Sequence, residues 1–385
     1  MRIIIIAYGF TGSTLPLIKS LTSKGHEVDC YYLADPGITE LEAFNFQKRY
    51  IFPGIHKIDI KKTNISSYFK SNDKITLNIV TIIRKRNKLK KIKINHLIDK
   101  IDNFTIKILC NKIKQKGYDA INVVGHMYPM DIIAAKFDKN KVWISLHEIY
   151  KNHLSQNKEL TTVTKFAIDN NYQIIVHSSF IFNKIRNYTS KVTLIRFGPF
   201  ETYNTYATKT ESNSYLLFFG YILPYKGLEL LYKAYQILKE KGLNIPIIIA
   251  GKGQDNYLEL FSKEKNVQII KKYISNQDLV SLINNCSYVI CPYLSASQSG
   301  IPQTANALGK RVIATNVGAF AETIFNNENG YLVKTNDPED MAKIIIEGLN
   351  NYEKEFLLTD YLNKHIEFNW SFICSKYITL FTTRI

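Results

Sequence analysis

The sequence predicts an α/β protein with two doubly wound parallel sheets, one in each half of the chain. Its 385 residues are too many for a single α/β core of ordinary size. Each half opens with an apolar strand that leads into a glycine-containing loop and then into a helix. Strands and helices alternate behind both openings, and such alternation places parallel strands between two layers of helices. The repeated opening therefore indicates two domains.

The first opening lies at the N-terminus. The apolar strand 2–7 is followed by Gly9 and Gly12 and then by a helical stretch that closes at Gly25. Residues 26–32 are expected to form the second strand. This order is the start of a parallel sheet.

Three later strands of the first half each end in a histidine. The strands are 121–124, 142–146 and 174–176, and the polar residues at their ends are His126, His147 with Glu148, and His177. Ligands of open α/β sheets bind outside the carboxyl ends of the strands. A single histidine in such a place is more often structural than catalytic, but three at equivalent strand ends favour at least one functional histidine. These residues are therefore candidates for the wall of a cleft.

The second opening starts with strand 215–219 and Gly220. A turn that ends in Lys226 and Gly227 precedes the amphipathic helix 228–241. The polar stretch before this opening has no apolar periodicity, which is typical of a linker between domains.

The segment 288–324 joins a strand, a polar loop and a short helix. The loop holds Gln298, Ser299 and Gly300. The helix should have Ser299 as its N-cap and run to about Leu308, with Gly309 just past its end. The N-terminus of a helix presents free N–H groups and a positive dipole end, so it can hold a diphosphate. Lys226 could add a full positive charge. Each feature is common alone, but their order and spacing together are specific.

The net charge of +17 lies entirely in the first half. Residues 1–200 hold 32 lysines and arginines against 15 acidic residues, whereas residues 201–385 hold 18 of each. The densest run consists of Arg84, Lys85, Arg86, Lys88, Lys90, Lys91 and Lys93. Such a run favours an anionic membrane surface, and Ile94, Leu97, Ile98 and Ile101 behind it have the spacing of an amphipathic surface helix. A solvated loop is the plain alternative, and no nucleic-acid motif accompanies the charge.

The composition argues against several classes of protein. No apolar run approaches the roughly 20 residues that cross a bilayer, and the apolar N-terminal run is too short for a signal peptide. The five cysteines are scattered without a CxxC pair, which favours a reduced, cytoplasmic protein without structural zinc. The sequence thus predicts a cytoplasmic protein without structural zinc, peripheral on the inner face of the plasma membrane.

On these motifs the chain resembles the GT-B glycosyltransferases and, within them, the retaining family 4, also called glycosyl transferases group 1. The resemblance covers nearly the whole chain and is most specific in FFGYILPYKGLELL, IIIAGKGQ, VICPYLSASQSGIPQTANALGKRVIATNVGAFAETI and NGYLV. It implies two Rossmann-like domains that face each other across a cleft. The implied parts are an acceptor-side domain at 1–200, a linker at 201–214, a nucleotide-sugar-binding domain at 215–365 and a helix at 366–385 that crosses back to the first domain.

The resemblance also implies an activity. A sugar would pass from a nucleotide-diphosphate-sugar, with UDP- or GDP-sugars favoured, to a hydroxyl of a saccharide or lipid-linked saccharide, with retention and without a metal. Family habit and the basic first half suggest the synthesis of a bacterial surface polysaccharide such as an O-antigen. Because the nucleotide-sugar would be a substrate, no cofactor is expected, and no nucleic-acid partner is expected either.

Individual residues match the family's functional positions. Lys226 matches the lysine that binds the diphosphate, and Gly9 matches the opening-loop glycine whose backbone approaches the donor. Gln298, Ser299 and Gly300 fall where the family holds the donor sugar and phosphates. His126 is the best match to the histidine near the reacting carbon.

Three positions depart from the family pattern. Tyr221 stands where many members have an arginine, and Ala296 and Thr304 stand where members usually have two glutamates. The first glutamate normally holds sugar hydroxyls, a role that Gln298 or Ser299 could take, and the second normally holds the ribose, to which Thr304 offers a weaker contact. Two other functions stay open: a non-catalytic polyanion- or nucleic-acid-binding protein on the same scaffold, and a nucleotide-sugar epimerase.

Overall fold

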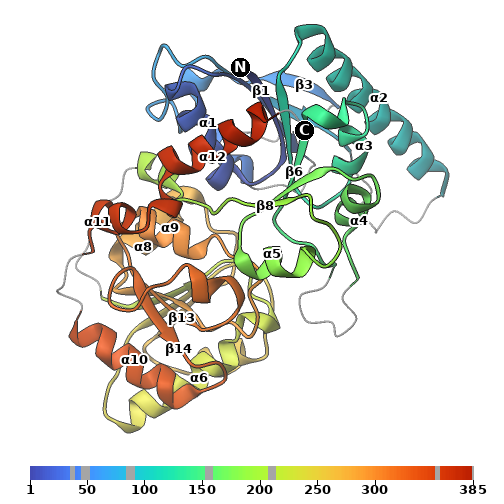
Figure 1. Cartoon of the computed structure of the whole chain (residues 1–385). Helices are drawn as coiled ribbons and strands as arrows, with labels where there is room; N and C mark the ends of the chain where they lie inside the picture. The colour runs from blue at the N-terminus through green and yellow to red at the C-terminus, as the bar shows by residue number, and fades with distance from the viewer. Residues whose placement is uncertain are drawn as a thin grey trace.

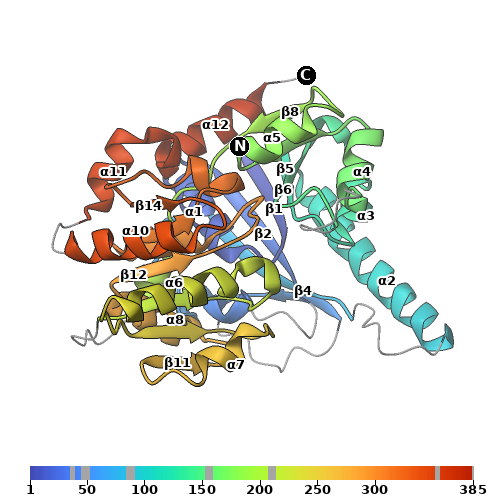
Figure 2. The same ribbon diagram turned by 90° about the horizontal axis from the view of Figure 1, so that it is seen from below.

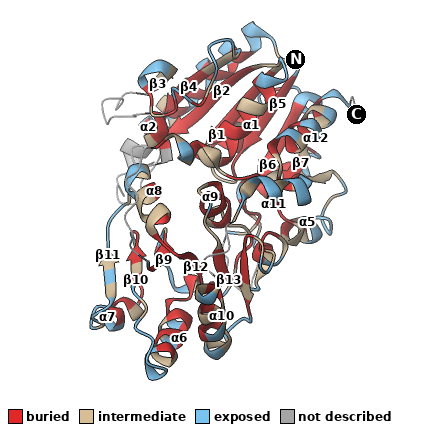
Figure 3. Cartoon of the chain, turned by 90° about the vertical axis from the view of Figure 1, so that its left-hand side faces the viewer, coloured by how far each residue is buried: buried red, intermediate tan, exposed pale blue. Residues whose placement is uncertain are grey.

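Two helix-covered sheets form the two halves of the molecule, as the sequence predicts (Figure 1). The computed structural model describes residues 1–34, 40–44, 53–83, 92–151, 159–206, 214–351 and 356–383. Buried residues concentrate in the two sheets and in the helix faces that pack against them (Figure 3). The predicted fold class is confirmed.

The first sheet has eight strands in the order β3-β4-β2-β1-β5-β6-β7-β8. The strands are β1 (Arg2–Tyr8), β2 (Glu27–Ala34), β3 (Gly54–Lys57), β4 (Ile75–Thr81), β5 (Ala120–Val124), β6 (Val142–Leu146), β7 (Gln173–Val176) and β8 (Val192–Leu194). All neighbouring pairs are parallel except β3 and β4. The strands that were predicted to end at His126, His147 and His177 are confirmed as β5, β6 and β7.

Both faces of the first sheet are buried, because alternate residues of β1 enter two different cores. Ile3 and Ile5 pack on the side of α1 (Thr11–Ser23). Ile4 and Ile6 pack on the opposite side, which is covered by α2 (Ile92–Lys116), α3 (Met130–Ala134), α4 (Thr162–Asp169) and α5 (Ser179–Ile185). This continuous apolar run is typical of a central parallel strand.

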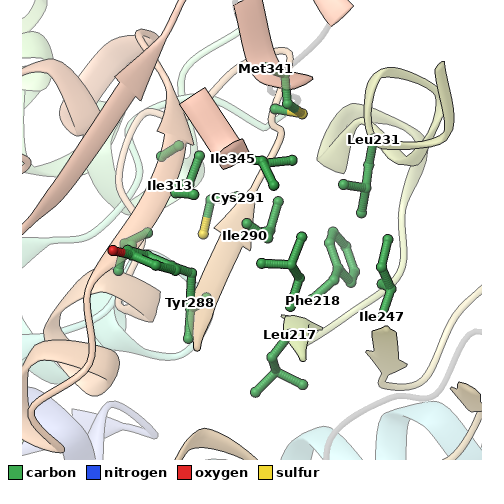
Figure 4. Packing of buried hydrophobic residues seen from close by; sticks show 14 of the residues in the cluster. Leu217, Phe218, Leu231, Ile247, Tyr288, Ile290, Cys291, Ile313, Met341 and Ile345 are labelled. Atoms are coloured by element: carbon green, nitrogen blue, oxygen red, sulfur yellow. The ribbon is translucent and has the colours of Figure 1, made fainter. Parts of the chain in front are cut away.

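The second sheet has six parallel strands in the order β11-β10-β9-β12-β13-β14. They are β9 (Leu216–Phe219), β10 (Ile247–Ala250), β11 (Val267–Ile270), β12 (Tyr288–Cys291), β13 (Val312–Thr315) and β14 (Gly330–Val333). The accompanying helices are α6 (Leu228–Glu240), α7 (Tyr257–Phe261), α8 (Asn276–Asn285), α9 (Ile301–Ala307) and α10 (Pro338–Asn350). Phe218 and Ile290 from the central strands meet Leu231 of α6 and Ile345 of α10 in one core (Figure 4).

The C-terminal segment returns to the first half. After α11 (Leu358–Lys364), helix α12 (Trp370–Thr382) packs beside α1 (Figure 1). The indole Nε1 of Trp370 donates a hydrogen bond to the carbonyl of Pro199 at 2.7 Å. The segment predicted as a linker begins with a 3₁₀ helix, η4 (Glu201–Thr205), which packs against α1 and α9, whereas residues 207–213 lie outside the described part.

Each sheet has a point at which the chain reverses its direction of winding. In the first sheet this point lies between β1 and β5, and in the second it lies between β9 and β12. Loops that leave the carboxyl ends of two such strands diverge to opposite faces and open a crevice between them. The two crevices are where a ligand site is expected.

The structure describes the helix behind the predicted basic run, but it does not describe most of the run itself. Residues 84–91 lie outside the described part, and so does the side chain of Lys93. The helix exists as α2, but the expectation that Leu97 and Ile98 share an apolar face is wrong: Ile98 is buried, whereas Leu97 is 58 % exposed. Within the described segments no helix is both long and apolar enough to cross a membrane.

Candidate active site

A cleft of about 510 Å³ lies between the two sheets at both crevices. Its walls come from the loops behind β1, β5 and β6 on one side and behind β9, β10 and β12 on the other. Of the residues predicted from the sequence, those that line it are His126, His147, Glu148, Tyr221, Lys226, Gln298, Ser299, Gly300 and Thr304. Gly9 and His177 are buried beside the cleft and do not line it.

Lys226 is held at the base of the second wall by a turn that only glycine can complete. It ends the 3₁₀ helix η5 (Pro224–Lys226), and Gly227 follows with φ of 74°. A Cβ at Gly227 would lie 1.9 Å from the carbonyl oxygen of Pro292. The glycine thus lets the turn lie against the end of β12 and directs Lys226 into the cleft.

Aromatic side chains surround the ammonium group of Lys226. The residue is 9 % exposed, and its Nζ donates to the hydroxyl of Tyr293 and lies 4.1 Å from the centre of that ring. Burial lowers the pKa of Lys226 to about 8. Among the described residues no carboxylate pairs with this lysine.

A buried cation without an acidic partner destabilises the folded protein. A pKa that falls from 10.5 to about 8 corresponds to a cost of about 3 kcal/mol at neutral pH. A hydrophobic side chain of similar size would avoid this cost. An anion bound beside Lys226 would restore the lost electrostatic stabilisation of the lysine.

The loop after β12 is connected to the lysine through Tyr293. The side chain of Ser299 is hydrogen-bonded to the Tyr293 hydroxyl, which already accepts from Lys226. Ser299 Oγ also accepts from the N–H of Ile301 at 3.3 Å. The prediction that Ser299 is the N-cap of α9 is wrong by one residue, because the cap position is Gly300.

Two other polar residues of this loop and helix differ in what they can offer a ligand. Thr304 Oγ1 donates to the carbonyl of Gly300 at 2.9 Å, so its proton is engaged within α9. The Oε1 atom of Gln298 is buried and has no hydrogen-bond partner among the described residues. Gln298 is thus the loop residue with unused hydrogen-bonding capacity at the cleft.

Phe200 joins the two walls below the cleft. A Cβ at Gly12 would lie 2.7 Å from the Phe200 ring, and a Cβ at Gly300 would lie 2.5 Å from it. The N–H of Phe200 donates to the carbonyl of Gln303 in α9 at 3.1 Å. The absence of side chains at Gly12 and Gly300 therefore lets one aromatic ring lie between the two halves.

An aromatic stack forms the wall of the first half. Phe10 has φ of 58° and places its ring 3.6 Å from that of His147, which is followed by Phe197 at 5.0 Å. Burial, together with the neighbouring His177 and His126, lowers the pKa of His147 well below its usual value. His147 is therefore neutral and contributes an apolar surface to the cleft.

The other two predicted histidines occupy different places. His177 stacks on Phe197 at 3.9 Å, and its Nδ1 donates to the carbonyl of Ile195 at 2.8 Å. Burial lowers the pKa of His177 to about 4, so it is a neutral residue behind the wall. His126 is half-buried, lines the cleft and lies 6.4 Å from the ring of Phe10.

Glu148 crosses the cleft to the loop after β12. Its Oε1 accepts from the N–H groups of Ile149 at 2.8 Å and Tyr150 at 3.1 Å, and its Oε2 accepts from the hydroxyl of Ser297. The hydroxyl of Ser178 donates to the carbonyl of Ser297 at 3.0 Å. The loop that leads to Gln298 is thus fixed by two residues of the first half.

Two further carboxylates join the halves at helix N-termini. Glu322 accepts from the N–H groups of Ser179 and Phe180 at the start of α5, at 2.8 and 3.1 Å, and also pairs with Arg196. Glu42 accepts from the N–H of Asn276 at the start of α8, at 3.0 Å. A carboxylate at this end of a helix dipole is favourable. The sequence reasoning missed both residues.

A second lysine of the cleft was also missed. Lys252 lies between Gly251 and Gly253 at the end of β10 and lines the same cavity. Side chains at these glycines would meet the carbonyl oxygens of Gly220 at 1.8 Å and Ile222 at 2.0 Å. The sequence signal was present, because a Gly-Lys-Gly turn directly follows a buried strand.

Comparisons with known proteins agree with this architecture. Residues 202–362 match the family described as Glycosyl transferases group 1. A glycosyltransferase of Methanocaldococcus jannaschii, described as uncharacterized, is 28 % identical over 262 residues, which cover 64 % of this chain and 70 % of that protein. The capsular polysaccharide biosynthesis glycosyltransferase of Staphylococcus aureus is 27 % identical over 182 residues, or 42 % of this chain and 47 % of that protein.

A solved structure shares the whole fold. The Anabaena protein HepE, in complex with UDP and glucose, matches with a TM-score of 0.62 and 15 % identity over 100 % of both chains. At this identity the likeness concerns the fold, which is GT-B.

Proposed function

We propose that this chain, a glycosyltransferase of the group 1, GT-B type, transfers a sugar from a nucleotide-diphosphate-sugar to an acceptor hydroxyl. In this proposal the transfer retains the anomeric configuration and needs no metal. The observation that carries the proposal is the buried ammonium of Lys226, which has no carboxylate partner among the described residues and faces the cleft. The donor diphosphate is the anion that this position would bind. Lys252 supplies a second positive charge on the same wall.

The reaction follows from the charges that such a site supplies. The bond between the anomeric carbon and the diphosphate oxygen breaks, negative charge grows on the leaving phosphate, and positive charge grows on the sugar ring. Lys226 is fixed by Tyr293 and needs no rearrangement to stabilise the leaving group. The acceptor oxygen bonds to the anomeric carbon on the same face, and its proton passes to the leaving phosphate oxygen.

The first wall positions and shields the reacting carbon. His147 is neutral and stacked, so the surface that it forms with Phe10 excludes water without adding charge. His126 is the histidine of the first half that is half-buried in the cleft, and in this proposal it orients the sugar or the acceptor.

The donor is proposed to be a UDP- or GDP-sugar. The structure of HepE, which shares the fold, is a complex with UDP and glucose, and this supports a nucleoside-diphosphate-sugar as the donor. In the proposed complex Gln298 holds sugar hydroxyls, because its carbonyl oxygen lacks a partner within the described structure. Tyr221 is 60 % exposed at the rim and takes the place of the family's arginine.

The acceptor is proposed to be a saccharide or lipid-linked saccharide of surface-polysaccharide synthesis. The Staphylococcus aureus relative is described as acting in capsular polysaccharide biosynthesis, and the excess of basic residues lies in the half that would hold the acceptor. The proposal includes a cytoplasmic protein that lies on the inner face of the plasma membrane.

A thermal-shift panel with UDP, GDP, ADP, CMP and their sugars tests the donor. We expect one nucleoside diphosphate to raise Tm by several degrees in the wild type and to have no such effect in Lys226→Ala. Lys241→Ala, on the exposed end of α6, is the matched control and should keep the shift. Tight, strongly salt-dependent binding to DNA or RNA without any nucleotide shift would instead favour the polyanion-binding alternative.

A further inference from the structure

Helix α2 presents a row of large apolar side chains to solvent. Leu97 is 58 % exposed, Phe104 is 64 % exposed and Ile108 is 44 % exposed. At 3.6 residues per turn these three positions lie within about 40° of one another around the helix axis. No other helix or strand of the described chain carries three large apolar residues with this exposure.

The fold does not need this row. The opposite side of α2 already supplies the core, through Ile106, Leu109 and Ile113, each at most 1 % exposed. Figure 2 shows α2 at the edge of the molecule, with its N-terminal end projecting away from both sheets. Exposed apolar rows of this kind usually mark an interaction surface.

Lysines border the row on both sides. Lys100 and Lys107 lie along one border and Lys112 along the other, and all three are exposed. The two acidic residues of α2 lie on the half turned toward the sheet, where Asp102 is 2 % exposed and accepts from the N–H of Ile83 at 2.7 Å. The outward half of the described helix therefore carries positive charge only.

We infer that the row Leu97, Phe104 and Ile108, with Lys100, Lys107 and Lys112, is the surface by which the protein lies on an anionic lipid bilayer. The helix would lie in the membrane plane, with its apolar side chains at the acyl boundary and its ammonium groups among the headgroups. A second copy of the chain is a poorer partner, because it would bring lysine rows together without carboxylates to pair with them. The inference rests on the membrane location within the proposed function and is independent of the donor.

Vesicle sedimentation tests the surface with the full chain. With vesicles of phosphatidylcholine and phosphatidylglycerol, we expect the variant Leu97→Ser, Phe104→Ser, Ile108→Ser to bind at least tenfold more weakly than the wild type. The variant Lys100→Gln, Lys107→Gln, Lys112→Gln should bind anionic vesicles more weakly and lose part of the salt dependence. The control variant Leu243→Ser, Leu260→Ser, Leu357→Ser removes three exposed apolar side chains, 37 to 46 % exposed, from the second half and should bind as the wild type does.

Wild-type affinity in the α2 serine variant, or an equal loss in the control variant, would overturn the inference. A wild-type dimer in size-exclusion chromatography that the serine variant turns into a monomer, with no vesicle binding, would also overturn it and identify a second copy as the partner. The nucleotide thermal shift separates the two proposals. Its absence in a wild type that still binds vesicles through α2 would refute the donor assignment alone.

Discussion

The affinity for a nucleoside diphosphate should fall as Lys226 loses its proton. In the free protein burial lowers the pKa of this lysine to about 8. A bound diphosphate favours the ammonium form and raises that pKa, so only the protonated free protein binds well. With a free-state pKa of about 8, the dissociation constant should increase about eightfold between pH 7.5 and 9, which is about 1.3 kcal/mol.

Calorimetric titration measures this linkage directly. The window from pH 7.5 to 9 lies above the second pKa of a phosphate group, about 6, so the ligand charge stays nearly constant. At pH 8 the complex should take up about half a proton, which titrations in buffers of different ionisation enthalpy reveal. Lys226→Arg keeps its charge throughout and should show neither the proton uptake nor the loss of affinity.

A dissociation constant that stays the same from pH 7.5 to 9 in the wild type would refute the reasoning. So would proton uptake in Lys226→Arg as large as in the wild type, because another group would then be titrating. Lys252 also lines the cleft, and Lys252→Ala is the control that tests whether it is that group.

The remaining predictions concern the same turn and loop. At pH 7 Lys226→Met should unfold at a higher temperature than the wild type, and its free energy of unfolding should be larger by up to about 3 kcal/mol. This gain should shrink as pH rises from about 8 toward 10.5, because the lysine of the folded wild type then loses its proton and the cost of burying its charge disappears. Gly227→Ala should lower the free energy of unfolding by at least about 2 kcal/mol, because the new Cβ would meet a carbonyl oxygen. Gly242 also has a positive φ, 76°, but open space around it, so Gly242→Ala should lower the free energy of unfolding by only about 1 kcal/mol. Thermal unfolding compares the two variants. Glu148→Gln and Ser297→Ala should each weaken nucleotide binding, and calorimetry on the double variant should show a coupling of about 1 kcal/mol, whereas additive effects would contradict a shared role.

The fold was predictable because it depends on local patterns. Strand β1 is apolar at every position from Ile3 to Ala7, which is what burial on both faces requires. Helix α2 shows the limit of such patterns. Its inner and outer faces are both apolar in places, so spacing alone could not tell that Ile98 points to the core and Leu97 to solvent.

The site was predictable in part for a related reason. Lys226 and Gln298 follow strand ends, and strand ends are visible in the sequence. Glu322 and Glu42 could not be found in this way, because their partners Ser179 and Asn276 are 143 and 234 residues distant along the chain. Such contacts become visible only when the two sheets are placed together.

In the proposed function, the contact between Glu148 and Ser297 brings a carboxylate to a loop that has no glutamate at position 296. Ala296 is 4 % exposed, and its carbonyl accepts from the N–H of Ala319, so a longer side chain there would have to displace the turn that covers it. The carboxylate at this loop instead comes from the first half, through Glu148. An acidic residue within the loop would be part of the loop in any arrangement of the halves, whereas Glu148 contacts the loop only when the halves meet. In the described arrangement the contacts that join the halves also fix the loop that, in the proposed complex, would hold the sugar. The same contacts would then order the donor loop and exclude water from the cleft.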